Sequence, residues 1–467
     1  MRHAFQQIKI EYEPSRIIQP GEKYIQFASR ETCLARDEVW IKWTLSHGLK
    51  GFIDFPSNNL YEYFVEEKSF LDLLEQLLQE IKDTWKSYIQ TYEKKRAQVI
   101  KSSTALSKSL QKGKKPLTLK KYLEFIRTGE EYSTYIWGPW AVIFHLEKKI
   151  IDQFPDELAV IQSLEEPIEF LKMKQDLHLK SIESVQKEYG WLPVYSPHDN
   201  PYTKEELLKM KGETKKEEVM EEFKGFKRNK KAFQKLLKKI KDPEIRKEVE
   251  IVHAFAFLKT DRVDAWKKAM HIQRPFYQHL ATRMGWEIEE AVNLFNEEII
   301  AFLESEKLPE RIKITLRSQN KPLYYFTSGQ VTVVESPALI EQTRSTLHPA
   351  NESITQFSGI TGCMGKTTGI VRVIHTPKDV EKIKQGDIFV ARFTFPSFTP
   401  KMIISKAIVT DEGGITNHAA IISREYNLPC IVNTKIATSI LQDGDLVEVN
   451  ADQGIVRILQ RNQQKSR

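Results

Sequence analysis

The stretch "TDEGGITNHAAIISRE", Thr410 to Glu425, places a pair of glycines and a histidine at the start of an amphipathic segment. The preceding run "AIVT" (Ala407 to Thr410) is apolar and β-branched, which predicts a buried strand. The run "HAAIISREYN" has alanine and isoleucine on one side, which predicts a short helix. Gly413 and Gly414 can form the tight turn between them. The stretch therefore predicts a strand, turn and helix unit of α/β type.

Thr416 or Asn417 is the natural N-cap of this helix, because either side chain can accept a hydrogen bond from a first-turn amide. His418 then lies in the first turn, where unpaired N–H groups and the helix dipole make an anion site. A neutral imidazole is nucleophilic at cellular pH and can carry a phosphoryl group. The structural alternative is that the glycines only make a turn and His418 only packs at the helix start.

Length and composition limit the protein class. A chain of 467 residues exceeds the roughly 250 to 300 residues at which a single core stops growing, so two or three domains are expected. Its 70 Lys and Arg against 63 Asp and Glu give a mild net charge of +7. No apolar run approaches the roughly 18 residues of a membrane span. Three widely spaced cysteines fit neither a disulfide framework nor a metal site. We expect a cytoplasmic protein with no membrane partner and no metal site.

The residue patterns predict a multidomain α and α/β protein. Up to residue 335 the spacing of apolar residues is mostly helical, and after residue 357 short strands rich in valine and isoleucine dominate. The predicted domains are an N-terminal helical segment 1–115, a helical domain 116–335 ending in a hairpin, a hinge or linker 336–356, and a small β/α domain 357–467.

Within the helical region, residues 38–121 are expected to be helical, with lysine-rich residues 101–121 as a loop between helices. The prolines of residues 189–203 exclude regular structure there. Residues 311–335 alternate between β-prone runs and turn residues, which predicts a hairpin. Tryptophans at helical spacing, such as Trp40 and Trp137, are expected in the core.

One glycine-rich segment is similar to a nucleotide-binding loop without matching it. "GITGCMGKTTG" (Gly359 to Gly369) contains Gly365-Lys366-Thr367, but the glycine required five residues before Gly365 is replaced by Ile360. The following "GIVRVI" predicts a strand, whereas that motif opens a helix. We interpret the segment as a turn with no phosphate role.

Four segments after Gly359 resemble, in order and spacing, the phosphohistidine or swivelling domain of phosphoenolpyruvate-utilising enzymes. This family includes phosphoenolpyruvate (PEP) synthase, pyruvate phosphate dikinase and rifampicin phosphotransferase. The matching segments are "GITGCMGKTTGIVRVI", "GDIFVARFTFPSFTPKM", "AIVTDEGGITNHAAIISREYNLPCIVNT" and "ATSILQDGDLVEVNADQGIV". The resemblance implies a swivelling phosphohistidine domain at the end of the chain. The helical region resembles, more weakly, the helical part that precedes this domain in some relatives.

The resemblance also implies site residues. His418 corresponds to the phosphorylated histidine, and Thr416 and Arg424 would act with it in catalysis. Asn417 stands where serine or cysteine is commoner in the family, which an N-cap position tolerates. Thr399 is the expected source of a further hydroxyl, although Ser397 competes for that position. The implied phosphate-stabilising residues are Gly413, Gly414, Asn417 and Thr399.

We recognise no segment that resembles the ATP-grasp domain or the PEP-binding barrel of complete family members, and we expect neither domain in this sequence. The resemblance therefore implies a phosphotransferase or kinase with no cofactor in this chain, served by ATP or PEP with magnesium on an ATP-grasp type partner. The helical domain would bind a small-molecule acceptor. The alternative is an adaptor or regulatory protein that uses phospho-His418 as a switch. A nucleic-acid partner, suggested only by the lysine-rich segments, is not expected.

Overall fold

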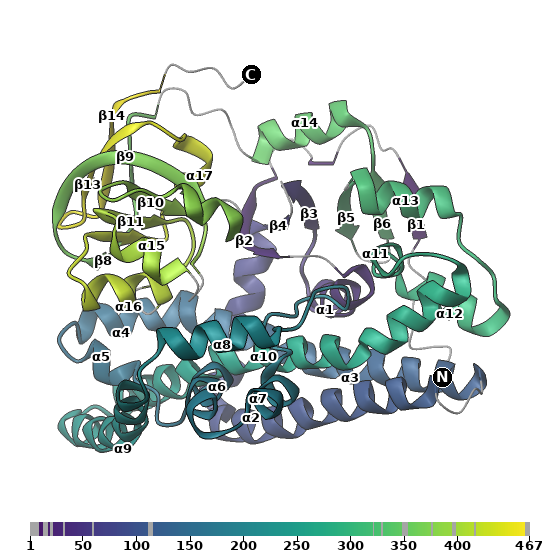
Figure 1. Cartoon of the computed structure of the whole chain (residues 1–467), viewed down its shortest axis with the longest axis horizontal. Coiled ribbons are helices and arrows are strands. Elements are labelled where there is room, and N and C mark those ends of the chain that lie inside the picture. Colours follow the sequence, from purple (N-terminus) through teal and green to yellow (C-terminus); the bar gives the residue numbers. More distant parts are fainter. Residues whose placement is uncertain are drawn as a thin grey trace. The chain divides into compact units, whose positions relative to one another are not determined.

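The computed structural model describes residues 9–12, 17–18, 22–30, 33–57, 60–110, 115–320, 322–327, 330–347, 354–374, 377–394, 398–414 and 417–462. The chain forms two compact units, and each is described by itself (Figure 1). Unit 1 is Met1–Pro56 with Leu60–Ser336, and unit 2 is mostly Pro337–Arg467. Among the described helices, none combines the length and the apolarity that crossing a bilayer requires.

Unit 1 contains a six-stranded sheet in the order β1-β6-β5-β3-β4-β2. Its strands are β1 (Lys9–Tyr12), β2 (Tyr24–Arg30), β3 (Phe52–Ser57), β4 (Leu60–Glu66), β5 (Leu323–Thr327) and β6 (Gln330–Val334).

The strands β3 and β4 correct the prediction that residues 38–121 are helical throughout. β3 pairs antiparallel with β5, so that Asp54 is opposite Tyr324. This pairing joins residues that are far apart in the chain, and local periodicity cannot detect it. The region as a whole is nevertheless mostly helical, as predicted.

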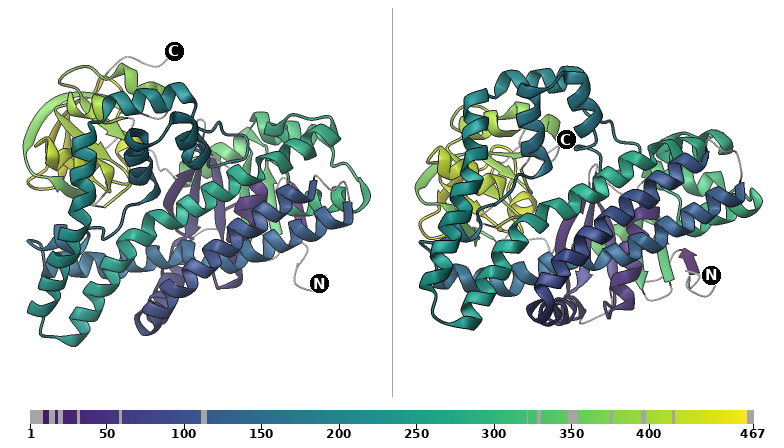
Figure 2. Two further views of the ribbon diagram at one scale, coloured as in Figure 1. Left: turned by 60° about the horizontal axis from the view of Figure 1, so that its bottom comes forward. Right: turned by 90° about the horizontal axis from the view of Figure 1, so that it is seen from below.

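The long helices of unit 1 run along this sheet and extend beyond it (Figure 2). They are α1 (Leu34–Ser46), α2 (Glu67–Ser109), α3 (Lys115–Val142), the π-helical turn η3 (Ile143–Glu147), α4 (Lys148–Gln153), α5 (Leu158–Ile161), α6 (Glu169–Leu179), α7 (Ile182–Tyr189), α8 (Lys204–Glu213), α9 (Lys216–Lys239), α10 (Pro243–Met284), α11 (Ile288–Ala291), α12 (Asn296–Ser305) and α13 (Arg311–Asn320). The long helices α2, α3 and α10 lie side by side (Figures 1 and 2). Between α7 and α8 the chain forms neither helix nor strand, which confirms the prediction for that segment.

The predicted loop at residues 101–121 is wrong for most of its length, because α2 continues to Ser109 and α3 begins at Lys115. Ser102 and Ser103 are buried, and their hydroxyls donate to the Val99 carbonyl at 3.0 and 2.8 Å. Ser102 also bonds Thr128 of α3, and Ser103 bonds Gln273 of α10. These serines therefore lie at the interface of α2 with α3 and α10, although the composition of the stretch predicted a loop.

The predicted hairpin at residues 311–335 is correct only from Leu323, because α13 occupies its first ten residues. Arg311 and Thr315, one helical turn apart, both bond Glu290. Arg317 is buried and pairs with Glu298 at 2.8 Å. These ion pairs with preceding helices favour helix in a sequence that by itself alternates like a strand.

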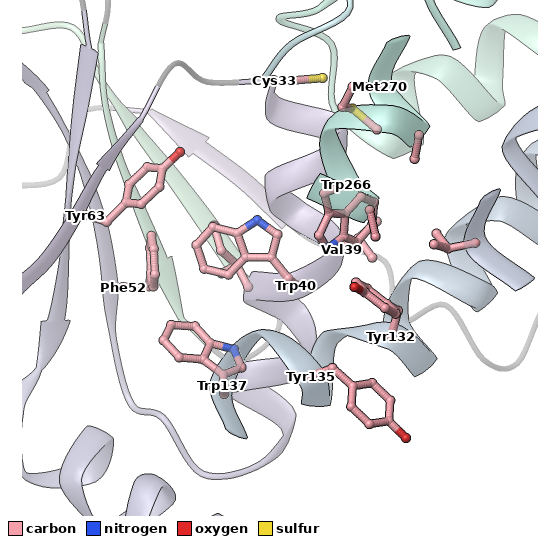
Figure 3. Close-up of a cluster of buried hydrophobic side chains, with 14 of the residues drawn as sticks. Cys33, Val39, Trp40, Phe52, Tyr63, Tyr132, Tyr135, Trp137, Trp266 and Met270 are labelled. Carbon is pink, nitrogen blue, oxygen red and sulfur yellow. The ribbon is translucent and has the colours of Figure 1, made fainter. Parts of the chain in front are cut away.

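The core of unit 1 is rich in aromatic side chains (Figure 3). Trp137 is fully buried and Trp40 is 7% exposed, which confirms their prediction as core residues. Trp40 packs edge-on against Phe52 of β3, with ring centroids 5.1 Å apart. This contact fixes α1 on the sheet.

Unit 2 is built on a second sheet, in the order β7-β14-β13-β9-β10-β11-β12-β8. The strands β9 to β12 are mutually parallel, and the remaining neighbours are antiparallel. Its elements are α14 (Pro337–Leu347), β7 (Gln356–Ser358), β8 (Ile360–Cys363), β9 (Lys366–Ile374), the 3-10 helix η4 (Pro377–Lys382), β10 (Ile388–Ala391), α15 (Thr399–Ile403), β11 (Ala407–Thr410), α16 (His418–Glu425), β12 (Cys430–Val432), α17 (Ala437–Ile440), β13 (Leu446–Asn450) and β14 (Ile455–Gln460).

The sheet of unit 2 separates two apolar clusters. Along β10, Ile388 and Val390 belong to one cluster, while Phe389 and Ala391 belong to the other, which α16 covers. This alternation is the expected consequence of the two-residue period of a strand. The strand predicted from "GIVRVI" is confirmed as part of β9. The predicted hinge at residues 336–356 is wrong in its first half, where α14 begins directly at Pro337.

Candidate functional site

The predicted strand, turn and helix unit around His418 is present. β11 ends at Thr410, and α16 begins at His418 with Asn417 as its N-cap. The Asn417 side-chain oxygen accepts a hydrogen bond from the Ala420 amide at 2.8 Å. Of the two N-cap candidates, Asn417 therefore has the capping geometry, and Thr416 lies outside the described residues.

The two glycines have different structural roles. Gly413 has a φ of +108°, a conformation that residues with a side chain rarely adopt. A Cβ at this position would also overlap the Asn417 side chain. At Gly414, by contrast, a Cβ would meet no heavy atom within 4 Å, and the Gly414 carbonyl accepts from the Asn417 amide at 2.9 Å. Gly413 is thus required by the turn, whereas Gly414 has open space beside the helix start.

Both ring nitrogens of His418 contact a threonine hydroxyl. Thr394 Oγ1 lies 3.0 Å from Nδ1, and Thr399 Oγ1 lies 3.1 Å from Nε2. A neutral imidazole has one N–H donor and one acceptor nitrogen, and each hydroxyl can take either complementary role. The ring is therefore fixed in orientation between the segment after β10 and the start of α15.

The structure brings Thr399 to the ring, while the competing Ser397 lies outside the described residues. Thr394 is not among the site residues predicted from the sequence. A signal for it existed: β10 and β11 are neighbouring parallel strands that end in register at Ala391 and Thr410. Ligand-binding residues gather at the carboxyl ends of such strands. Thr394, three residues beyond β10, follows that rule.

Arg424 contacts a neighbouring strand. It lies six residues after His418, about 9 Å further along the helix axis at 1.5 Å per residue. Its guanidinium donates to the Gly362 carbonyl of β8 at 3.1 Å. In this conformation the arginine attaches α16 to the neighbouring strand, and its role toward a phosphoryl group stays a prediction.

Two acidic residues hold the loop before the histidine. Asp411 is buried, and burial raises the pKa of its carboxyl above the usual value, against the opposing effect of its hydrogen bonds. That carboxyl accepts from the Thr434 hydroxyl at 2.8 Å and from the Thr438 amide at 3.1 Å. Glu412 pairs with Arg392 at 2.8 Å. These contacts attach the glycine turn to the loops after β10 and β12.

The site is thus defined by an imidazole at a helix N-terminus, held by two hydroxyls at the carboxyl edge of a parallel sheet. Residues 383–454 match the family model "PEP-utilising enzyme, mobile domain". This part of unit 2 is therefore similar to the mobile domain of PEP-utilising enzymes.

Several curated proteins are similar to parts of the chain. A probable phosphoenolpyruvate synthase of Archaeoglobus fulgidus is 36% identical over 171 residues, 34% of this chain and 23% of the relative. The phosphoenolpyruvate synthase of Pyrococcus furiosus is 33% identical over 209 residues, 42% of this chain and 25% of the relative. The uncharacterized phosphotransferase YvkC of Bacillus subtilis is 26% identical over 351 residues, 67% of this chain and 41% of the relative. This chain thus matches less than half of the length of each of these relatives.

Proposed function

We propose that His418 accepts a phosphoryl group and passes it on, so that the chain acts in histidine-mediated phosphotransfer. The observation that carries the proposal is the fixed imidazole, with a hydroxyl at each ring nitrogen and the N-terminus of α16 beneath it. The matched mobile domain and the similarity to phosphoenolpyruvate synthases support it.

In the proposed step, the Nε2 lone pair attacks phosphorus, an N–P bond forms, and the P–O bond to the donor breaks with the leaving group keeping its electron pair. Thr394 Oγ1 accepts a hydrogen bond from the Nδ1–H group, which favours the tautomer with an unprotonated Nε2. Thr399 Oγ1, which lies 3.1 Å from Nε2, turns to donate to a phosphoryl oxygen. The dipole of α16 and its first-turn amides stabilise the added negative charge. Gly413, Gly414, Asn417, Thr416 and Arg424 complete the proposed phosphate-stabilising set.

The donor and acceptor belong to the same proposal. An ATP-grasp type protein, using ATP or PEP with magnesium, supplies the phosphoryl group, and unit 1 binds a small-molecule acceptor. Because the domain that carries the phosphoryl group is tethered to unit 1, the group would meet the acceptor at a high effective concentration. The similarity of YvkC, whose match extends over two thirds of this chain, supports a joint role for both units.

The test is phosphoryl labelling of the full chain with ATP or PEP, with and without an ATP-grasp type partner. We expect an acid-labile, base-stable label that His418→Ala abolishes. His47→Ala is the matched control, because His47 lies in unit 1, exposed and stacked on Trp43, and its loss should leave the label intact. A label that survives His418→Ala would falsify the carrier proposal. A stable label with no acceptor consumed would instead favour the regulatory switch.

A further inference from the structure

Two of the three free cysteines, widely separated in sequence, meet in unit 2. Cys363 of β8 and Cys430 of β12 are register partners in an antiparallel pair, at a bulge where the register shifts between Cys430 and Ile431. Directly opposed residues in such a pair have Cα atoms about 4.5 to 5.5 Å apart. Disulfides span Cα distances of about 4.4 to 6.8 Å, so the backbone spacing is suitable for a bond between them.

Both side chains lie on the same side of the sheet. Cys430 is fully buried in the apolar cluster that α16 covers, and Cys363 packs against that cluster from the sheet edge. Gly362, beside Cys363, leaves space for the Cys430 sulfur, because a Cβ there would lie 2.9 Å from it. The two thiols therefore lie in or against the same apolar cluster, which also contains residues of α16.

We propose that Cys363 and Cys430 form a reversible disulfide when the protein meets a peroxide oxidant, and that this bond attaches the edge strand β8 to β12. Cys363 is the attacking residue, because it is half-buried while Cys430 is fully buried. The site is independent of the proposed phosphotransfer.

The chemistry needs only hydrogen peroxide as co-reactant. The Cys363 sulfur attacks one peroxide oxygen, the O–O bond breaks, and a sulfenic acid and water form. The Cys430 sulfur then attacks the Cys363 sulfur, the S–O bond breaks, and the proton of Cys430 leaves with a second water. Two thiols and one peroxide thus give one disulfide and two waters.

The reaction should be slow at neutral pH. Burial raises the pKa of the Cys363 thiol above its usual range, although the nearby Arg424 guanidinium opposes this effect, and burial raises the pKa of Cys430 to about 12. Because the thiolate is the nucleophile, the rate should increase about tenfold per pH unit while the pH stays below the pKa of Cys363.

The test treats the reduced full chain with hydrogen peroxide, unfolds it, blocks the remaining thiols with N-ethylmaleimide and maps its peptides. We expect one blocked thiol, at Cys33, a linked peptide pair containing Cys363 and Cys430, and reversal by dithiothreitol. The thermal transition of unit 2 should rise by about 5 °C or more, because the bond closes a long loop.

Two variants make the result specific. Cys363→Ser should leave Cys430 fully available for blocking, whereas Cys33→Ala, which changes a buried thiol of unit 1, should keep the linked pair. The proposal is overturned if peroxide leaves three blockable thiols in the wild-type chain, or if it converts Cys363 to sulfinic acid without a linked peptide. A failure of His418 labelling would not affect either result.

Discussion

Each of the two units buries an aspartate, and the two aspartates differ in their hydrogen bonds. Asp411 of unit 2 accepts hydrogen bonds from Thr434 and Thr438, and so holds the glycine turn before His418. Asp54 of unit 1 is fully buried, and neither of its carboxylate oxygens has a hydrogen-bond partner among the residues that the structure describes. Burial and the nearby charge of Asp37 raise the pKa of Asp54 well above its usual value.

The difference shows how one residue type can serve two purposes. A buried carboxylate with several donors organises loops, because removing it leaves each donor unsatisfied. A buried carboxyl without donors is more stable in its neutral form, because a charge without partners is costly in an apolar environment. Three predictions test this contrast, in order of expected effect.

The largest effect is expected for Asp411→Ala. It removes the acceptor of the Thr434 hydroxyl and of the Thr438 amide and hydroxyl. We expect unit 2 to lose about 3 kcal/mol of stability, since an unsatisfied buried donor costs about 1 to 3 kcal/mol. Urea denaturation followed by a probe in unit 2 measures the loss. The double variant Asp411→Ala with Thr434→Val should lose less stability than the sum of the losses of the two single variants. Strict additivity would contradict a stabilising hydrogen bond between Asp411 and Thr434.

A smaller, opposite effect is expected for Asp54→Asn. The folded-state pKa of Asp54 is raised above the unfolded value, so the native state holds the proton more tightly. The stability that this proton contributes is complete below the unfolded pKa, near pH 4, and is lost as the pH rises toward the folded pKa. Asp54→Asn should therefore stabilise unit 1 by about 1 kcal/mol at pH 8 and less at pH 5.

Urea denaturation of unit 1 at several pH values measures this dependence. The matched control is Asp83→Asn, because the Asp83 side chain on α2 is 80% exposed. It should change stability little at any pH. If Asp54→Asn destabilised unit 1 more at pH 8 than at pH 5, Asp54 would have hydrogen-bond donors in the native state, as Asp411 does.

The smallest effect is expected for Asn417→Ala, which removes the cap of α16 but no buried charge. Unit 2 should lose about 1 kcal/mol of stability, and the Asn417→Gly variant should lose only about 0.3 kcal/mol. Both variants should still accept a phosphoryl label, at a reduced rate. A cost as large as that of Asp411→Ala would show that Asn417, which also bonds the Glu412 carbonyl, is the principal anchor of the turn.

Much of unit 2 could be predicted from sequence because its signals are local. The strand before Asp411, the glycine turn and the short helix follow each other within twenty residues, and the structure has all three. Thr394 was missed because its contact with His418 depends on the parallel pairing of β10 with β11. Arg424 was placed at the phosphate by resemblance alone, and the tertiary structure bonds it to Gly362.

By itself, the sequence determined the composite α and α/β class, the helix that starts at His418 and the family of the C-terminal domain, because periodicity, turn residues and motif spacing are short-range properties. Only the tertiary structure decided the sheet of unit 1, the isolation of Asp54 and the meeting of Cys363 with Cys430. Each of these depends on which distant segments pair, and the free energy of that pairing comes from burial summed over the whole unit.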